Sequence, residues 1–463
     1  MYKSPSSAAS PLAAHFTRSG LLRFALPSIG MMLVTSIYTV TDGIFIGRLA
    51  GSSALAASNI VYPAINLLLG LGIMMASGGS ALVTKNLGEG RLLSARGRFS
   101  FILMASLLLS SLLAVSYWIW QMPLLSLLGA SPTLLPAARD YLLVQLPFFP
   151  AMAAMLLFNA FYIADGHPEQ GLRVAIIAGV TNAALDYICM GPLQMGIAGA
   201  GLATGMANLG GALYGALYFS RFSHQLRFTR PDLSLRVLTQ TMGNGSSELV
   251  TQLSVGITTL LFNIITFRYA GEDGITAISI ILYAEMLLTS LFMGFSTGVA
   301  PIFSFHFGRR DYGEIRRLLR LSLTSIACCA LFVFGAAQVL AAPLAGLFLT
   351  TDASAYELTR DGFRLFAFSF LLSGLNMFTS SFFTALSDGR TSALISSCRN
   401  LFGIIIFLVA LPHFLGLPGV WLAVPFSDMT ALVLAFWLLY TRQPRPAVAA
   451  RRLSDGISRV SRG

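Results

Sequence analysis

Five carboxylic acids lie inside long apolar stretches of this chain. Placing a carboxyl group near the centre of a bilayer costs about 2.5 to 3.5 kcal/mol on insertion scales, so such groups tend to face a helix-bundle interior or a wet cavity and to carry ions or protons. The chain has 19 acidic residues, and the other acids fall in loops or at the ends of apolar stretches. The first candidates for chemistry are therefore Asp42, Asp186, Glu248, Glu285 and Asp428.

Two of these acids have polar neighbours at helical spacing. Tyr38 precedes Asp42 by one turn, and Asn182 precedes Asp186 by one turn, so each pair shares a helix face. The next apolar stretch offers Thr204. Two carboxylates with amide and hydroxyl oxygens suit a pair that exchanges a proton, and they equally suit an oxygen-lined sodium site, because hard cations take oxygen ligands. The residues alone leave both alternatives open.

The remaining acids and one proline suggest further roles. Glu248 and Glu285 fall about midway through their stretches, where they would attract a cationic substrate or a coupling ion, and Asp428 is a third acid of the same half. Pro27 lies about four turns before Asp42. Because proline removes a backbone hydrogen bond and bends a helix, the first apolar stretch is a candidate moving part.

The elements that position these residues are membrane-spanning helices. With 463 residues, 55% hydrophobic and 11% charged, and a mean hydropathy of +0.74, the chain is too apolar for a soluble globular protein, whose charged fraction is about 25%. Stretches long enough to cross about 30 Å of hydrocarbon as helices fall at 21–46, 54–84, 99–121, 139–163, 171–191, 197–220, 236–267, 274–305, 318–348, 361–386, 392–414 and 417–441.

The twelve predicted spans divide into two homologous halves. Residues 48–51 (Arg-Leu-Ala-Gly) match residues 268–271 (Arg-Tyr-Ala-Gly), and the same offset of 220 pairs Gly196 with Gly416. Six spans in each half make the repeats parallel, related by an axis along the membrane normal. We therefore expect an all-α polytopic membrane protein with two six-helix lobes at 21–220 and 236–441. A segment at 1–20, a linker at 221–235 and a basic tail at 442–463 complete this division.

Basic residues orient the predicted spans. Lys and Arg accumulate in cytoplasmic loops, and with the N-terminus inside, nearly all of the 30 basic residues, including Arg390 and Arg399, fall on inner segments. The outer exceptions are Arg48, Arg139, Arg268, Arg360 and Arg364. Both termini are therefore expected in the cytoplasm. The net charge of +11 then meets an anionic inner leaflet, and no nucleic-acid partner is implied.

The repeat also shows where the halves differ. At the offset of 220, Asp42 falls on Phe262 and Glu285 falls on Ile65, whereas Asp428 falls on the polar Asn208. Duplication therefore kept the frame while the acids diverged, which favours a coupling site confined to the first half.

The chain resembles a known family of transporters. The resemblance rests on Pro27, Asp42-Gly-Ile-Phe-Ile-Gly47, Gly51, Pro63, Gly78-Gly79 and Gly88, with a second copy that ends at Gly308 and Arg316. This pattern is similar to the multidrug and toxic compound extrusion (MATE) family of secondary transporters over essentially the whole chain. The resemblance implies two lobes around a central cavity, alternating access, and export of organic cations and amphiphilic drugs in exchange for protons or sodium.

The resemblance also implies roles for particular residues. The family's cation site in the first lobe corresponds to Asp42, Asn182, Asp186 and Thr204, with Tyr38, Tyr141, Asn159 and Pro27 in its surroundings. Glu248 resembles the acid of the seventh span that several members require. The tenth span departs from some members because it holds Asn376 and no acid, which shifts the expected cation site to the first lobe.

Two other activities compete with drug antiport. A flippase for lipid-linked precursors would need a large cationic cavity, and the predicted spans hold almost no basic residues away from their ends. A lipid-modifying enzyme would need a polar catalytic cluster at one membrane face, and the sequence shows none. The chain also lacks a G-x-x-x-x-G-K-[ST] phosphate loop, so export would run on an ion gradient. We expect a monomeric, non-enzymatic transporter of the bacterial inner membrane that takes small cationic or amphiphilic molecules and has no cofactor beyond its coupling ion.

Overall fold

The computed structural model describes residues 10–350 and 354–442, which form helices joined by short turns and contain no strand. The helices are α1 (Arg18–Phe45), α2 (Ser52–Gly88), α3 (Leu92–Ile119), α4 (Gln121–Leu127), α5 (Leu135–Gln145), α6 (Phe149–Ala164), α7 (Pro168–Met190), α8 (Gly196–Leu217), α9 (Leu235–Gly308), α10 (Tyr312–Phe348), α11 (Ser354–Phe366), α12 (Phe370–Ala385), α13 (Gly389–Ser397), α14 (Ile404–Leu415) and α15 (Leu417–Arg442). Short 3₁₀ or π turns occupy Pro11–Ala13, Ile46–Ala50, Leu146–Phe148, Tyr218–Phe222, Ala367–Ser369 and Cys398–Gly403.

The helix lengths agree with twelve membrane spans. Within the described ranges, ten helical stretches are long and apolar enough to cross a membrane. One of them, α9, has 74 residues and contains two helices that meet at Gly271, where φ is 62° and ψ is −147°. Glycine adopts that conformation at little steric expense. The glycine-rich α8 is less apolar than these ten, and with α9 counted twice it brings the total to the predicted twelve.

The internal duplication is present in the backbone as well as in the sequence. Several turns have a positive φ at residues exactly 220 positions apart, which means that corresponding helices end in the same way in both halves. These pairs are Gly51 (91°) with Gly271 (62°), Gly90 (75°) with Arg310 (58°), and Gly196 (56°) with Gly416 (65°).

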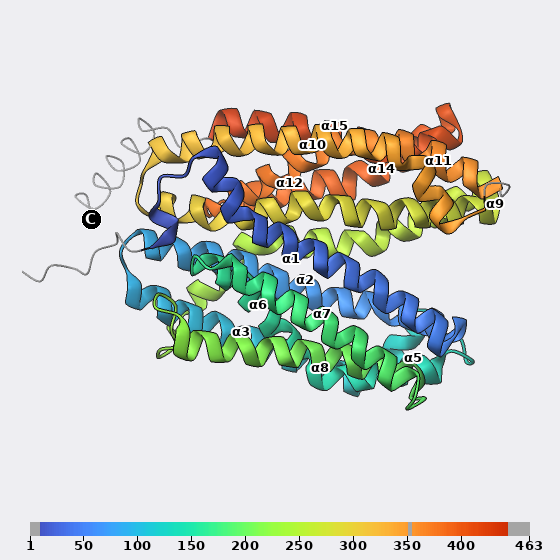
Figure 1. Ribbon diagram of the computed structural model, residues 1–463, viewed down its shortest axis with the longest axis horizontal. Helices are drawn as coiled ribbons and strands as arrows, with labels where there is room; N and C mark the ends of the chain where they lie inside the picture. Colours follow the sequence, from blue (N-terminus) through green and yellow to red (C-terminus); the bar gives the residue numbers. More distant parts are fainter. Residues whose placement is uncertain (1–9, 351–353, 443–463) are drawn as a thin grey trace, which may run out of the picture.

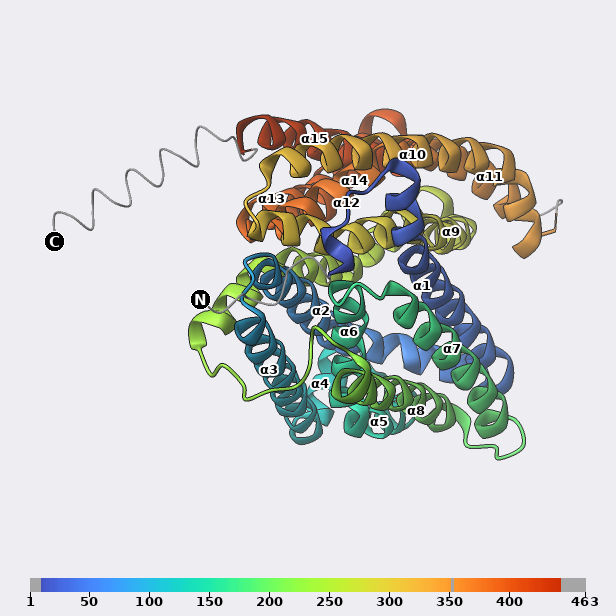
Figure 2. The ribbon, with the colours of Figure 1, turned by 60° about the vertical axis from the view of Figure 1, so that its left-hand side comes forward.

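The helices form two groups that lie side by side. Helices α1 to α8 make up the N-terminal group and α9 to α15 the C-terminal group, with α1 and α2 running along the boundary (Figures 1 and 2). The connection between the groups, residues 223–234, lies at one end of the long axis. We call this end, which also holds the start of α1 and the turns after α2 and α9, the linker end.

Glycines allow backbone contact between the two groups toward the linker end. A Cβ atom built on Gly88 would lie 2.0 Å from the carbonyl oxygen of Phe305, and one on Gly308 would lie 2.1 Å from that of Lys85. Any side chain at these positions would overlap the facing backbone. Further close approaches along the same boundary place Gly78 on Thr241, Gly245 on Met74 and Gly294 on Ile29.

The boundary is looser farther from the linker end. Tyr62 of α2 and Tyr283 of α9 interact electrostatically across the two groups, yet these side chains are 46% and 54% exposed. The groups are therefore in tight contact at the linker end and more open in the opposite half.

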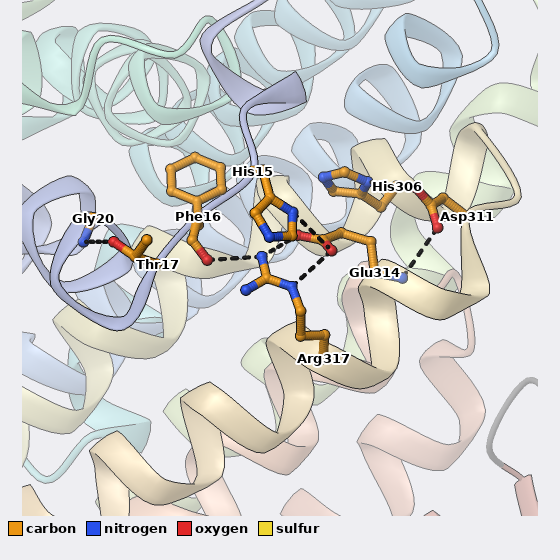
Figure 3. A network of polar contacts seen from close by, with 8 residues as sticks. All are labelled: His15, Phe16, Thr17, Gly20, His306, Asp311, Glu314 and Arg317. Atoms are coloured by element: carbon orange, nitrogen blue, oxygen red, sulfur yellow. Dashed lines mark hydrogen bonds and ion pairs between the residues drawn. The ribbon is translucent and has the colours of Figure 1, made fainter.

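A short segment before α1 crosses the linker end from one group to the other (Figure 3). We call residues 10–17 the strap. Its Pro11 packs on Gly166 of the N-terminal group, where a Cβ atom would lie 2.8 Å from the Pro11 Cγ. On the other side Arg317 of α10 donates to the carbonyl oxygen of Phe16 at 2.7 Å, and Glu314 lies 3.4 Å from His15. The strap therefore ties both groups together.

The connection between the groups is anchored on a buried acid. Asp165, which follows α6, is 1% exposed and accepts hydrogen bonds from the Tyr218 hydroxyl (2.9 Å), the Ser223 hydroxyl (2.8 Å) and the Leu226 amide (3.1 Å). Burial raises the pKa of this carboxyl group, and the hydrogen bonds oppose that rise. The anchor fixes the beginning of the connection to the N-terminal group.

Part of the predicted terminal organisation lies outside the described residues. This applies to residues 1–9 of the N-terminal segment and to the basic tail beyond Arg442. Arg442 itself ends α15, donates to the Thr391 hydroxyl at 2.6 Å and lies 3.6 Å from Asp388.

Candidate functional site

Helices α1 and α7 bring Asp42 and Asp186 together in the N-terminal group. The two helices pack against each other at Gly179 of α7, where a Cβ atom would lie 3.5 Å from the Tyr38 Cβ, an ordinary van der Waals distance. One and two turns farther along α7 come Asn182, 2% exposed, and Asp186, 0% exposed. The polar face predicted for α7 is therefore buried against α1 and its neighbours.

The two carboxyl groups lie within hydrogen-bonding range of each other. Asp42 Oδ1 and both carboxyl oxygens of Asp186 are buried and have no donor among the described residues. Two ionised carboxylates only accept hydrogen bonds, so the pair needs a proton between its oxygens or a cation beside them. This geometry suits the capture and release of a small positive charge.

Amide, hydroxyl and phenol groups surround the pair. Asn182 donates to the Thr204 hydroxyl of α8 at 3.3 Å. Tyr38 interacts electrostatically with Asp42, and the buried Tyr141 of α5 interacts with both carboxyl groups. The predicted residues therefore come from four helices into one cluster, which we call the acid pair cluster: Asp42, Asp186, Asn182, Thr204, Tyr38 and Tyr141.

Two other predicted neighbours lie apart from this cluster. The carbonyl oxygen of Asn159 faces Gly171, which is about four helical turns before Asp186. The Asn159 Oδ1 atom is buried and has no hydrogen-bond partner among the described residues. Pro27 lies within α1 near its start, beside Ser28, which packs under Gly298 of α9. It therefore belongs to the contact between the two groups.

The acids of the C-terminal group occupy different settings. Asp428 of α15 is 0% exposed, and its Oδ1 atom lies 2.5 Å from Arg399 Nε in an ion pair. Asn376 of α12 donates to the Asp428 backbone oxygen at 2.8 Å, and Glu285 of α9 interacts electrostatically with the ion pair. Glu248 makes no ion pair or side-chain hydrogen bond among the described residues, so it stands apart from both clusters.

Arg399 was counted with the inner segments although the predicted span 392–414 includes it, and the structure places it inside a span. Arg399 is 9% exposed and belongs to the π turn Cys398–Gly403 within a membrane-crossing stretch. The π turn sits where α15 approaches closely, because a Cβ atom on Gly403 would lie 2.2 Å from the Ser427 hydroxyl oxygen. The spans were expected to hold almost no basic residues away from their ends, and Arg399 is an exception to that pattern. Asp428 in a neighbouring span could have indicated that Arg399 is buried, since a buried cation needs a counter-charge.

Replacement of Asp428 by asparagine should destabilise the protein strongly. Removing one partner of a buried ion pair leaves an uncompensated charge, which costs about 3 to 5 kcal/mol. Thermal unfolding of the purified protein in detergent should show a clear loss relative to the wild type and to Asp140→Asn, which changes an exposed acid. The double variant Arg399→Leu/Asp428→Leu should recover part of the loss. An Asp428→Asn protein as stable as the wild type would contradict the role of this ion pair.

No cluster of three or more His, Cys, Asp or Glu residues in the described ranges is arranged to hold a metal ion. A sodium ion at the acid pair cluster would instead use two carboxylates together with the Asn182 amide oxygen and the Thr204 hydroxyl. These are the oxygen donors that a hard cation takes.

Solved structures of known transporters share this fold. The chain superposes with a TM-score of 0.86 on "Crystal structure of MATE in complex with MaD3S", at 21% identity over 94% of this chain and 97% of the other. It superposes with a TM-score of 0.85 on "Outward-facing conformation of a multidrug resistance MATE family transporter of the MOP superfamily", at 21% identity over 96% and 98%.

Sequence comparison finds related proteins of similar length. The chain is 23% identical to "Multidrug export protein MepA" of Staphylococcus saprophyticus, over 94% of this chain and 96% of that protein. It is 22% identical to the protein of the same name in Staphylococcus aureus, with the same coverage. The family model MatE matches residues 27–188 and 249–409. Since these ranges make up more than half of the sequence, the chain belongs to the MATE family of transporters.

Proposed function

We propose that this protein is a secondary active antiporter that exports organic cations or amphiphilic drugs in exchange for protons or sodium ions. The acid pair cluster is the observation that carries the proposal. It places the buried Asp186 carboxyl group next to the partly buried Asp42 carboxyl group, with oxygens that lack donors, inside a helix bundle of a membrane transporter. A cation or proton that binds there removes the repulsion between the carboxylates, and its release restores that repulsion.

The two helix groups supply the moving parts of this transporter. We assign the lobes to residues 21–220 and 236–441, joined by 221–235, and the linker end to the cytoplasm of a bacterial inner membrane. Backbone contacts between the groups occur at that end, while Tyr62 and Tyr283 remain half-exposed in the opposite half. In this arrangement a cation enters the acid pair cluster from outside, and rocking of the lobes exposes the substrate path to each side in turn.

The membrane potential adds to the driving force. It contributes about 2.3 kcal/mol per charge for each 100 mV when a cation moves inward. That free energy is enough to matter for the export of a drug against its gradient. The names of the relatives from Staphylococcus describe multidrug export, which supports a broad range of small substrates.

A gradient experiment tests the proposal and separates the two coupling ions. Purified protein in liposomes would be loaded with a fluorescent cation such as ethidium, and a proton gradient or a sodium gradient would be imposed separately. Efflux above that of protein-free liposomes under at least one gradient is the expected result. If neither gradient accelerates efflux of any tested cation or amphiphile, the antiport proposal is wrong.

The flippase alternative gains no support from the buried arginine. Arg399 is a cation inside a span, but it is paired with Asp428 at 2.5 Å. Its charge is therefore already neutralised and is not available for a pyrophosphate group.

A further inference from the structure

A cavity of ≈ 320 Å³ lies at the linker end, on the boundary between the two helix groups. Its walls come from the end of α2, the first turns of α3, the last residues of the connecting segment and the first turn of α9. We call it the basic pocket, and its lining residues include Lys85, Arg91, Arg98, Arg236, Glu89 and Asp232.

The basic pocket has two cations more than it has paired acids. Arg91 lies 3.1 Å from Glu89, and Arg98 lies 3.7 Å from Asp232, so each acid has its own arginine. The other two cations, on Lys85 and Arg236, form no ion pair among the described residues; the Lys85 ammonium group lies 5.1 Å from the centre of the Phe307 ring. The pocket therefore carries a net charge that an anion would neutralise.

Two helix starts add to this positive field. Helices α3 and α9 begin beside the pocket, after Arg91 and Ser234, and neither of these residues caps its helix with a side-chain hydrogen bond. The first amide groups of a helix carry partial positive charge and are donors without a helical partner. Together with the lysine and arginine side chains, they match the several oxygens of a phosphate group.

The wall on the N-terminal group is held in place before any ligand arrives. Arg96 of α3 donates to the backbone oxygens of His224 (2.8 Å) and Gln225 (2.9 Å), and the Asp232 amide donates to the Gly97 oxygen at 3.1 Å. The connecting segment thus lies along α3 and ends beside Arg98. A phosphate group would join this preformed wall to Arg236 on the other group.

We propose that the basic pocket binds a phosphate-bearing anion, either the headgroup of an anionic phospholipid or free phosphate, and that the bound anion holds the two helix groups together at the linker end. The ligand would contact both Lys85 of α2 and Arg236 of α9, which line the pocket, and would lose one of these partners when the helices separate. Binding itself follows from the geometry of the pocket. Its effect on the transport cycle rests on the proposed antiport function.

Binding is measured on the full-length protein in detergent with three probes: inorganic phosphate, dioctanoyl phosphatidylglycerol and dioctanoylglycerol, which has the same tails and no phosphate. The wild type should bind phosphatidylglycerol, phosphate or both, and bind dioctanoylglycerol much more weakly. Strong binding of the lipid alone identifies a headgroup site, and equal binding of phosphate identifies a site for the free ion. The double variant Lys85→Gln/Arg236→Gln should raise the dissociation constant at least about tenfold.

The matched control removes the same charge elsewhere. Arg23→Gln/Arg221→Gln changes two exposed arginines outside the pocket and should leave binding within about twofold of the wild type. Arg236→Gln alone changes an exposed side chain, so it should fold normally and still weaken binding; Arg236→Lys should restore most of it. The proposal is overturned if neither phosphate-bearing probe binds, or if the control pair loses as much affinity as the pocket pair.

The two proposals can fail separately. If the protein binds phosphate in a way that Arg236→Gln weakens, but shows no gradient-driven efflux, the antiport proposal is wrong and the binding proposal is supported. If the protein shows gradient-driven efflux but binds no phosphate group, the binding proposal is wrong and the antiport proposal is supported.

Discussion

Replacement of Asp42 by asparagine should abolish gradient-driven efflux. Asparagine keeps the size of the side chain but cannot take up a proton or supply a charged ligand, so Asp186 loses the partner with which it shares a positive charge. Efflux of a fluorescent cation from proteoliposomes, under whichever gradient drives the wild type, should fall to the level of protein-free liposomes. Asp186→Asn should give the same loss.

The double variant provides a check on this interpretation. Because the two carboxyl groups act as a unit, Asp42→Asn/Asp186→Asn should be no worse than either single variant. Asp140→Asn, which changes an exposed acid of α5, should transport like the wild type. Efflux by Asp42→Asn that still responds fully to the gradient would show that coupling takes place elsewhere, with Glu248 and Glu285 as the next acids to examine.

Replacement of Gly88 by alanine should prevent closure of the linker end. The new Cβ atom would lie 2.0 Å from the Phe305 carbonyl oxygen, a distance that no small side-chain movement relieves, because the neighbour is backbone. Overpacking of this kind costs about 1 to 3 kcal/mol or more. Because the contact forms only when the linker end is closed, this cost raises the free energy of the closed state alone. Since 1.4 kcal/mol is tenfold in a ratio of populations, the ratio of closed to open protein should fall by about fivefold or more, and efflux should fall with it.

Spin labels on the two sides of the linker end measure this change directly. Their distance distribution should shift to larger values in Gly88→Ala, and Gly308→Ala should behave alike because its Cβ atom would lie 2.1 Å from the Lys85 oxygen. Gly256→Ala is the matched control, since a Cβ atom there meets nothing within 4 Å. Unchanged distances and full efflux in Gly88→Ala would mean that these glycines do not limit closure.

Most of the membrane-spanning helices could be predicted from the sequence, because a span is recognisable as a long, apolar stretch of residues. The repeat added more, since its constant offset also places turns with positive φ, as at Gly51 and Gly271. The π turn at Cys398–Gly403 could not be predicted, because its extra residue per turn depends on the close approach of α15 through Gly403. The strap could not be predicted either, since its contacts join residues far apart in the sequence: Pro11 with Gly166, and Phe16 with Arg317.

The acid pair cluster was accessible from the sequence for a different reason. Spacing along one helix shows which residues share a face, so Asn182 and Asp186 could be paired directly. Thr204 was offered by the next apolar stretch, and the family resemblance supplied Tyr141. Spacing says nothing about which faces of distant helices meet. The sequence therefore did not show that Arg399 neutralises Asp428. It also did not show that Asn159 lies apart from the acid pair cluster.

The strap has a consequence for the speed of transport. Opening of the linker end must break the bond from Arg317 to the Phe16 oxygen or pull Pro11 away from Gly166, because the strap holds on to both groups. Both contacts lie far along α1 from Asp42, so they take no part in ion binding. The strap contacts should therefore limit the rate at which the linker end opens. If the protein works as the proposed antiporter, changes in the strap sequence should alter the number of transport cycles per second and leave the ratio of ions to drug molecules unchanged.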